Sequence, residues 1–399
     1  MSTTPPNLVL VPGTPGPKAP RRRADGRPTI VHVVGARPNF VKMAPVIVAL
    51  ERRQIFNQVV VHTGQHYDSK MSDDVLRDLD FPEIDRYLNV GSGTHGVQTA
   101  RVLSAIEPVL VETDPEVIVV AGDVNSTLAC ALAASKLGIA IAHLESGLRS
   151  FDWSMPEEVN RVLTDRLADT LFTPSKEAVD NLEAEGIGAE RVYNVGNTMI
   201  DSLRRCEPAA RALEAWRSAG VAERRYVLVT LHRPSNVDDP DRLAAIVGGL
   251  VELARSAPVV FPIHPRTRAR LEGDGGLTRL EAAGVRCIDP VGYLDFLSMQ
   301  AGAGAIVTDS GGVQEEASAL GVSCFTFRPN TERPITLTHG TNVLLADDPA
   351  ALAEVRPSPH PPTPCAIPLW DGHAGDRVAD VLVANYALTI GAGVSLAAT

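Results

Sequence analysis

Short apolar segments alternate with amphipathic helical segments along most of this chain, and this alternation constrains its fold. A β-branched run at 29–36 ends at a glycine and leads into helical spacing over 39–53. Further segments of the same β-rich kind are predicted as strands at 57–65, 116–123, 139–146, 225–232, 258–265, 285–290, 304–310 and 322–328. Strands separated by helices of this length form βαβ units, so the pattern predicts parallel sheets covered by helices.

The alternation occurs in two series, separated near 197–225 by a charged and mostly helical stretch. A length of 399 residues also exceeds what one ordinary core supports. We therefore expect an α/β protein with two Rossmann-like, doubly wound domains facing a cleft, the first at 29–198 and the second at 199–370. Residues 1–28, rich in proline, glycine and arginine, are predicted to be a disordered tail.

Composition argues against several classes of partner. The formal net charge is −11, whereas nucleic acids and anionic membranes require a basic face. No apolar run approaches the roughly 18 residues of a membrane span, and the N-terminus does not read as a signal peptide. The five cysteines are scattered, as in a reducing compartment. We expect a cytoplasmic protein with no nucleic-acid or membrane partner.

Polar residues follow the predicted strands, where ligand-binding loops of open parallel sheets lie. They are Arg37, Gln65, His66, Asp123, Glu145, His232, His264 and Ser310. The segment GARPNFVKMAP offers a bare glycine backbone, Arg37 and Lys42 to an anion at a helix N-terminus, although a tight turn with solvated cations would look the same. It matches neither G-x-G-x-x-G nor the P-loop pattern.

The segment TDSGGVQEEASALG carries a sharper signal for nucleotide binding. Ser310, Gly311 and Gly312 open a helix, where glycine lets a diphosphate approach the free N–H groups. Glu315 and Glu316 follow, at a distance suited to ribose hydroxyls. Helix capping is the alternative interpretation of these carboxylates.

Acidic residues are dense in the first half of the chain. Asp123 follows a predicted strand, where it could also be a helix N-cap, and 143–161 contains Glu145 and Glu157 among many ionisable groups. Carboxylates that share one cleft repel each other and lose solvent, which raises their pKa values toward those of general acids and bases.

The second half offers an anion clamp. His232 and His264 each belong to a loop with arginines after a predicted strand, and Arg333 lies in TERP. No histidine–carboxylate spacing resembles a metal site, and no G-x-S-x-G elbow is present. We expect neither a metal nor a cofactor.

These motifs together resemble one family. GARPNFVKMAPV, TGQHYD, GDVNST, HLESGLRS, PEEVNR, GNTMID, LVTLHRPSN, DSGGVQEEAS, RPNTERP and DGHAGDRV occur in the order found in non-hydrolysing UDP-N-acetylglucosamine 2-epimerases, from about residue 29 to 385. The resemblance implies a GT-B-like architecture, a last helix at about 371–390 that crosses back to the first domain, and a homodimer. It also implies interconversion of UDP-GlcNAc and UDP-ManNAc for polysaccharide biosynthesis.

The family's chemistry eliminates UDP from C1 as a proton leaves C2, and adds UDP back to the 2-acetamidoglucal after protonation of the other face. The resemblance places Asp123, Glu145 and Glu157 as acid/base candidates, with the base left open, and His232 beside the leaving diphosphate. The resemblance also implies that the phosphates are bound by Arg37, Lys42, Ser310, Gly311, Gly312 and Arg333. It implies that Glu316 binds the ribose and Phe296 the uracil, and His264 completes the substrate-binding set as part of the anion clamp.

The chain departs from many bacterial members at Tyr67, Pro234 and Ser235, where they carry charged residues. Some of these positions form an allosteric UDP-GlcNAc pocket in those members, so the departures argue against allosteric activation of this chain. They also leave room for a UDP-linked 2-acetamido uronic acid or diacetamido sugar. A GT-B glycosyltransferase, a hydrolysing epimerase and a non-catalytic nucleotide-sugar sensor are the alternatives.

Overall fold

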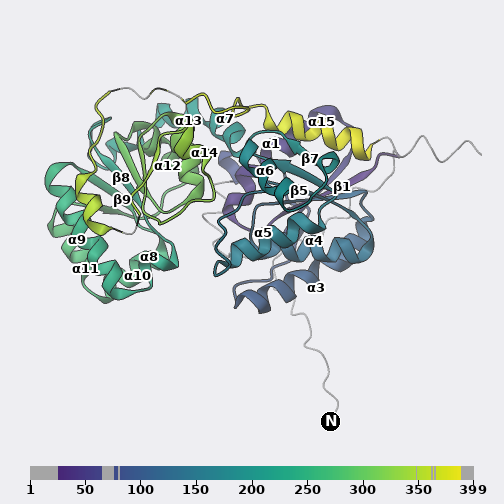
Figure 1. Cartoon of the computed structure of the whole chain (residues 1–399), viewed down its shortest axis with the longest axis horizontal. Coiled ribbons are helices and arrows are strands. Elements are labelled where there is room, and N and C mark those ends of the chain that lie inside the picture. Colours follow the sequence, from purple (N-terminus) through teal and green to yellow (C-terminus); the bar gives the residue numbers. More distant parts are fainter. Residues whose placement is uncertain are drawn as a thin grey trace, which may run out of the picture.

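The computed structural model describes residues 26–64, 76–79, 81–346, 348–360, 363 and 365–387, and the side chain of Arg37 is outside this description. Most of the predicted tail at 1–28 therefore lies outside the described residues. The same is true of three residues in a predicted loop, Gln65, His66 and Tyr67. Within the described part the chain forms two sheet-centred domains side by side, connected by α7 (Thr198–Leu213) (Figure 1).

The N-terminal domain has seven parallel strands in the order β3-β2-β1-β4-β5-β6-β7. Their bounds are β1 (Thr29–Val34), β2 (Asn57–His62), β3 (Arg86–Tyr87), β4 (Val117–Ala121), β5 (Ala140–Leu144), β6 (Thr170–Thr173) and β7 (Val192–Asn194). The central strands are buried on both faces, which explains their continuous apolar runs. The prediction missed β3, β6 and β7.

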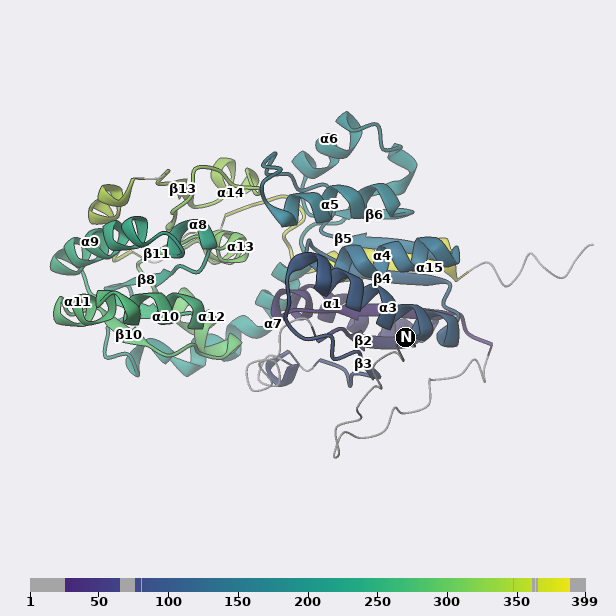
Figure 2. The same ribbon diagram turned by 90° about the horizontal axis from the view of Figure 1, so that it is seen from below.

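Helices cover both faces of this sheet (Figure 2). They are α1 (Arg37–Arg53), α3 (His95–Thr113), α4 (Asn125–Leu137), α5 (Pro156–Leu167) and α6 (Lys176–Ala184). α4 packs between α3 and α5, and α1 packs against α7.

The C-terminal domain repeats the plan with six parallel strands in the order β10-β9-β8-β11-β12-β13. Their bounds are β8 (Val227–Thr230), β9 (Val259–Pro262), β10 (Arg286–Ile288), β11 (Ala305–Thr308), β12 (Cys324–Thr326) and β13 (Asn342–Leu344), of which the edge strand β13 was not predicted. Its helices are α8 (Pro234–Val237), α9 (Pro240–Ser256), α10 (Pro265–Gly273), α11 (Gly276–Ala282), α12 (Tyr293–Gly302), α13 (Gly311–Leu320) and α14 (Ile335–Thr338).

The last helix, α15 (Ala374–Tyr386), lies against α1 and α7 on the N-terminal domain (Figure 1). Asp201 of α7 fixes its start, because its carboxylate accepts from the backbone N–H groups of Ala374 (3.2 Å) and Gly375 (2.7 Å). Nη2 of Arg53 in α1 donates to Oδ1 of Asp380 at 2.5 Å. The chain thus returns from the second domain to the first.

Both strand orders reverse at a point where ligands bind in open α/β sheets. In the first sheet the reversal lies between β1 and β4, and in the second between β8 and β11. Within each domain the loops that follow these strands are joined to each other, and the two domains meet through the loops after β5 and β12, as the contacts below show. The predicted class, two doubly wound parallel-sheet domains, is confirmed.

Candidate active site

The first loop is held by an asparagine at the start of α1. Oδ1 of Asn39 accepts from the backbone N–H groups of Gly35 (3.1 Å) and Ala36 (2.9 Å), and its Nδ2 donates to the carbonyl of Ala121 at 2.8 Å. This side chain satisfies free backbone groups at the loop and joins the carboxyl ends of β1 and β4. The loop is therefore rigid where it borders the site.

Glu145 directly follows β5 and connects both domains. Its φ of 65° lies in the left-handed region, which glutamate rarely adopts and which is found at functional sites. Oε2 of Glu145 pairs with Nζ of Lys42 from α1, and Oε1 accepts from Nη2 of Arg333 at 2.9 Å. Lys42 and Arg333 are both buried, so the carboxylate is neutralised by one cation from each domain.

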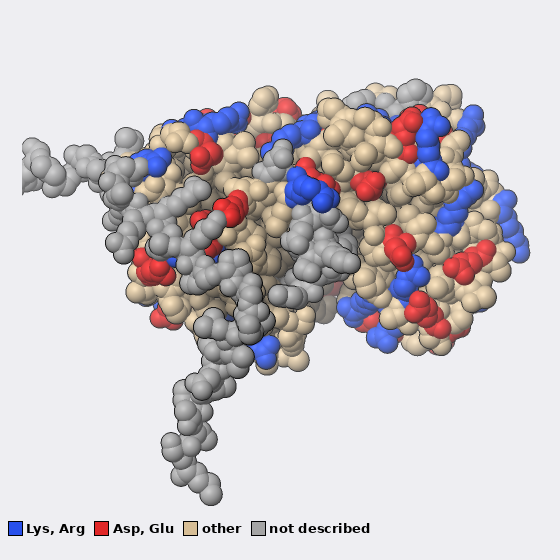
Figure 3. All heavy atoms as spheres, turned by 180° about the vertical axis from the view of Figure 1, so that it is seen from behind, with Lys and Arg blue, Asp and Glu red and all other residues tan. Residues whose placement is uncertain are grey.

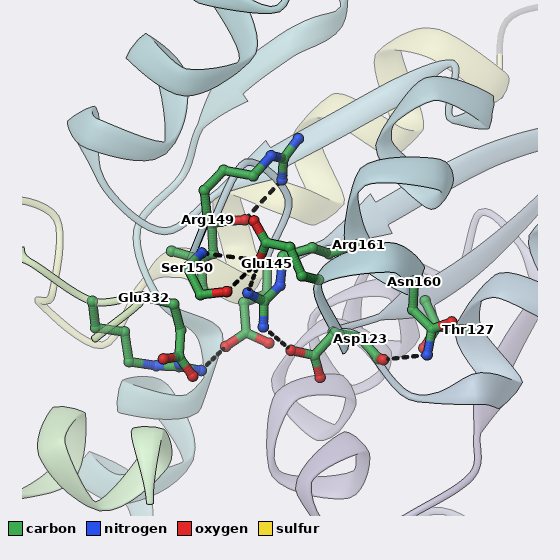
Figure 4. Close-up of polar contacts among 12 residues, drawn as sticks. Asp123, Thr127, Glu145, Arg149, Ser150, Asn160, Arg161 and Glu332 are labelled. Carbon is green, nitrogen blue, oxygen red and sulfur yellow. Dashed lines mark hydrogen bonds and ion pairs between the residues drawn. The ribbon is translucent and has the colours of Figure 1, made fainter. Parts of the chain in front are cut away.

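Asp123 and α5 form a second part of the site. Nη2 of Arg161 pairs with Oδ2 of Asp123, and Nη1 of Arg161 donates to Oε2 of Glu158 at 2.5 Å. Burial acts to raise the pKa of Asp123, but the charges of Arg161 and Lys42 outweigh it and lower that pKa. Asp123 therefore remains a carboxylate able to accept a proton. Figure 4 shows Asp123 and Glu145, which come after β4 and β5, together with Arg161 from the middle of α5.

Glu158 fixes the loop between β5 and α5. Its Oε2 accepts from the backbone N–H (2.9 Å) and the hydroxyl (2.8 Å) of Ser150, and its Oε1 accepts from the N–H of Phe151 at 2.9 Å. Asn160, on the same helix, donates to the carbonyl of Asp123 at 2.8 Å. The loop and Asp123 are thus positioned by one helix.

Arg333 is the centre of the C-terminal half of the site. Besides Glu145, its guanidinium lies 2.8 Å from Oε1 of Glu332 (Nη1) and 3.0 Å from Oε2 of Glu315 (Nε). These three carboxylates raise the pKa of Arg333 although its burial opposes them. Glu332 also contacts Arg233 and Arg328, which lower its pKa against the effect of burial.

Arg333 lies over the start of α13. A methyl group placed on Gly311 would come within 2.4 Å of Nη1 of Arg333, so a larger residue there would have to displace this guanidinium. Ser310 is the N-cap residue of α13, and Gly312 follows with open space except for Met199. The arrangement brings a guanidinium to the free N–H groups of a helix N-terminus, where phosphates bind.

His232 is anchored by a buried carboxylate. Asp309 accepts from the backbone N–H groups of His232 (3.1 and 3.0 Å) and Arg233 (2.9 Å), and from Nδ2 of Asn236 at 3.1 Å. Nδ1 of His232 lies 3.1 Å from Oδ1 of the same carboxylate. The ring remains partly exposed and contacts that of His264, with centroids 5.6 Å apart.

The structure thus brings Asp123, Lys42, Glu145 and Arg333 into one network. Glu157 is half-buried in the first turn of α5, outside the contacts described above, whereas its neighbour Glu158 is buried within them. Phe296 is half-buried in α12, and Glu316 of α13 accepts from Nε2 of Gln300 at 2.6 Å. His264 caps α10 and accepts from the N–H of Arg266 at 3.2 Å.

Sequence reasoning did not assign several positions to the site. They are Asn39, Arg161, Glu158, Asp309 and Glu332; Glu315 was considered for the ribose alone. The spacing of Glu158 and Arg161, three residues apart on one helix face, was a signal for an ion pair. Asp309, at a predicted strand end directly before the Ser-Gly-Gly motif, was a second signal.

Charge is dispersed over the surface. Lys and Arg side chains are interspersed with Asp and Glu on the face shown in Figure 3, where described atoms are visible. Within the described residues, no helix combines the length and apolar character needed to cross a bilayer. In the same part of the chain, no three His, Cys, Asp or Glu side chains cluster as metal ligands would.

The N-terminal domain carries the carboxylates Asp123 and Glu145. They face the C-terminal domain, in which α13 begins with two glycines beside Arg333. Two doubly wound domains with such a site define a GT-B-like nucleotide-sugar enzyme. The sequence profile of the family described as UDP-N-acetylglucosamine 2-epimerase matches residues 48–383. The chain belongs to this family, as its motifs predicted, and it is an epimerase rather than a glycosyltransferase.

Relatives and solved structures agree with this membership. A UDP-N-acetylglucosamine 2-epimerase of Methanocaldococcus jannaschii is 43% identical over 357 residues, covering 88% of this chain and 97% of that protein. A UDP-2,3-diacetamido-2,3-dideoxy-D-glucuronate 2-epimerase of Pseudomonas aeruginosa is 46% identical over 320 residues, covering 79% and 88%. The crystal structure of the M. jannaschii UDP-GlcNAc 2-epimerase with UDP-GlcNAc and UDP superposes with a TM-score of 0.82 at 41% identity, covering 89% and 99%. The GT-B-like fold class is thereby confirmed.

Proposed function

We propose that the chain interconverts UDP-N-acetylglucosamine and UDP-N-acetylmannosamine by inverting C2 of the sugar. The observation that carries this proposal is the contact of Glu145 with Arg333, which joins an acid/base candidate to the predicted phosphate-binding loop. The similarity to an M. jannaschii UDP-GlcNAc 2-epimerase crystallised with UDP-GlcNAc and UDP supports the choice of substrate.

The reaction we propose has two reversible halves. In the first, a carboxylate takes the proton from C2, a C1–C2 double bond forms, and the C1–O bond breaks with its electron pair going to UDP. In the second, an acid protonates C2 on the opposite face, and UDP attacks C1 to restore the glycosidic bond. Atoms and charge balance without an oxidant, water or another reactant.

The geometry supports different roles for the carboxylates. The lowered pKa of Asp123 keeps it in the ionised form that a base requires, although it also makes the carboxylate a weaker base. Glu145 lies between Lys42 and Arg333, cations that would also attract the departing diphosphate. Glu157 remains the third acid/base candidate on α5.

The C-terminal half would bind the nucleotide. We assign the diphosphate to the N-terminus of α13 with Arg333, and the exposed edge of His232 to the leaving oxygen, where an imidazolium would stabilise the developing charge. The remaining assignments follow the family motifs: Arg37 and Lys42 to phosphate, Glu316 to ribose, Phe296 to uracil and His264 to the clamp. Neither a metal nor a cofactor enters this scheme.

Solvent exchange tests the proposal. The purified protein is incubated with UDP-GlcNAc in D₂O, and the products are followed by NMR and mass spectrometry. We expect UDP-ManNAc with deuterium at C2, and deuterium at C2 of the recovered UDP-GlcNAc. Substrate that stays unlabelled while UDP binds would identify a sensor instead, and accumulation of free ManNAc would identify a hydrolysing epimerase.

A modified sugar is the second candidate substrate, and a specific observation favours it. The P. aeruginosa relative that acts on a UDP-diacetamido-glucuronate is as similar to this chain as the M. jannaschii epimerase. The same D₂O assay with UDP-GlcNAc, UDP-2-acetamido-uronate and UDP-2,3-diacetamido-uronate in parallel decides between them through kcat/KM. A higher value for either uronate would reassign the substrate.

Two further assignments complete the proposal. We propose a homodimer, which light scattering after size exclusion would show as twice the chain mass of 42.5 kDa. We also propose a cytoplasmic location, because none of the five cysteines, all of which lie in the described part of the chain, forms a disulfide, as in a reducing compartment. A monomer in solution, or export of a tagged chain, would contradict these two assignments.

A further inference from the structure

Arg333 is shared among three carboxylates that differ in what else they contact. Glu145 also pairs with Lys42, and Glu332 also pairs with Arg233. Glu315 has no second cation within ion-pair distance in the described part of the chain.

The surroundings of Glu315 make it dependent on Arg333. The side chain is buried, its Oε1 accepts from the uncharged amide of Asn197 at 2.9 Å, and its Oε2 lies 3.0 Å from Nε of Arg333 without the alignment of a hydrogen bond. The charged groups that face it are Arg333, Glu145 and, further away, Lys42. If Arg333 turned away, a buried carboxylate would lose its only direct cation.

A nucleotide diphosphate would compete for that cation. This step rests on the proposed function, which places the diphosphate at the N-terminus of α13, beside Gly311 and beneath Arg333. Two phosphate charges attract a guanidinium more strongly than one carboxylate does. An uncompensated buried carboxylate is costly and neutralises by binding a proton.

We propose that Glu315 is a positioning residue, which holds Arg333 in the ligand-free enzyme and takes up a proton when Arg333 moves to a bound diphosphate. Binding of the nucleotide is thereby coupled to proton uptake. The proton offsets one of the negative charges that the diphosphate brings to the buried network.

The free enzyme is already close to this change. Burial raises the pKa of Glu315 to about 7, with the charge of Glu145 acting in the same direction and Arg333 opposing both. Removal of the opposing guanidinium leaves burial and Glu145 to favour the protonated form, against the amide of Asn197 and the more distant Lys42. Proton uptake at neutral pH and above is therefore expected.

Calorimetry tests the proposal with UDP as the probe. Titration of the full-length protein at pH 8 in buffers of different ionisation enthalpy measures the protons bound per UDP. At this pH the terminal phosphate of UDP is already ionised, because phosphate monoesters have a second pKa of about 6. We expect uptake of between half a proton and one proton in the wild type, and little uptake in Glu315→Gln. Glu252→Gln, an exposed glutamate on α9, is the matched control and should behave as the wild type.

A second measurement does not depend on a substitution. The affinity of the wild type for UDP should fall by up to about tenfold for each pH unit above 7, since a proton is a co-reactant of binding. Equal proton uptake in the wild type and Glu315→Gln, or an affinity that does not change between pH 7 and 9, would overturn the inference. Failure of both proteins to bind UDP at all would instead overturn the proposed function.

Discussion

Nη2 of Arg333 and Oε1 of Glu145 are 2.9 Å apart, although one belongs to the C-terminal domain and the other ends a strand of the N-terminal sheet. The contact joins the two carboxyl edges of the sheets, and it is buried on both sides. A proton-transfer group and a diphosphate-binding group therefore lie within reach of a single sugar nucleotide.

This relationship predicts the effect of Glu145→Gln. The amide keeps the size of the side chain but cannot exchange a proton, and loss of a general acid or base costs about 10²- to 10⁴-fold in rate. We expect turnover of UDP-GlcNAc to fall by that factor while UDP still binds, because removal of a negative charge leaves Lys42 and Arg333 free for phosphate. Steady-state kinetics and calorimetry measure both quantities. Glu183→Gln, an exposed position on α6, should leave both unchanged. A comparable loss of UDP binding would indicate a binding role for Glu145 instead.

The two glycines that open α13 predict opposite effects of alanine. In Gly311→Ala the new methyl group would overlap Nη1 of Arg333 at 2.4 Å, so the guanidinium must leave its three carboxylates, and we expect a loss of about 1–3 kcal/mol in the free energy of unfolding. In Gly312→Ala the nearest atom is Sδ of Met199 at 3.6 Å, an ordinary contact, so stability should stay the same or rise by up to about 1 kcal/mol. Urea unfolding of both variants measures the difference. Equal stabilities would show that Arg333 is not held against Gly311.

Much of the fold could be predicted from the sequence because parallel strands are buried on both faces. β1 and β4 are continuous apolar runs whose bounds lie inside the predicted segments, and their ends mark the loops that carry the site. The edge strands β3 and β13 were missed, and β3 has only two residues and therefore no periodicity of its own.

The partners of the site residues were less predictable than the residues themselves. Lys42 stood out after the loop GARPN and Arg333 in the loop TERP, but their shared contact with Glu145 depends on how two domains meet. Nearly two hundred positions separate Glu145 from Arg333 in the sequence. Asp201 gave no functional signal, since its role at the start of α15 exists only after the chain has crossed back.

Removal of that carboxylate predicts a weaker attachment of the last helix. Asp201→Ala takes away the acceptor for two backbone N–H groups at the start of α15, and loss of an N-terminal cap costs about 0.5–2 kcal/mol. We expect a lower free energy of unfolding and faster proteolysis near residue 387. Asp180→Ala is the control, because this exposed partner of Lys176 on α6 contributes at most about 0.5 kcal/mol. If both variants lost the same stability, the cap on α15 would be irrelevant to it.

Asp309 predicts a dependence of stability on pH with a defined sign. Burial acts to raise the pKa of this carboxyl, but His232, the N–H of Arg233 and Asn236 outweigh it and hold the pKa below its ordinary value of 3.8. Near and below 3.8 the unfolded chain therefore binds the proton more readily than the folded one. The stability contributed by Asp309 is complete well above pH 3.8, and it is lost as the pH falls through the lower folded value.

Asp309→Asn should remove this dependence. The amide leaves one carboxylate acceptor fewer for His232, Arg233 and Asn236, so we expect a loss of about 1–3 kcal/mol at pH 7. Unfolding in urea at steps between pH 7 and pH 3 should show the wild type approaching the variant as acid neutralises its carboxylate. A constant difference in the free energy of unfolding between the two proteins over this range would mean that the pKa of Asp309 is the same in the folded and unfolded chain. The loop of His232 would then be held by the hydrogen bonds of Asp309 and not by its charge.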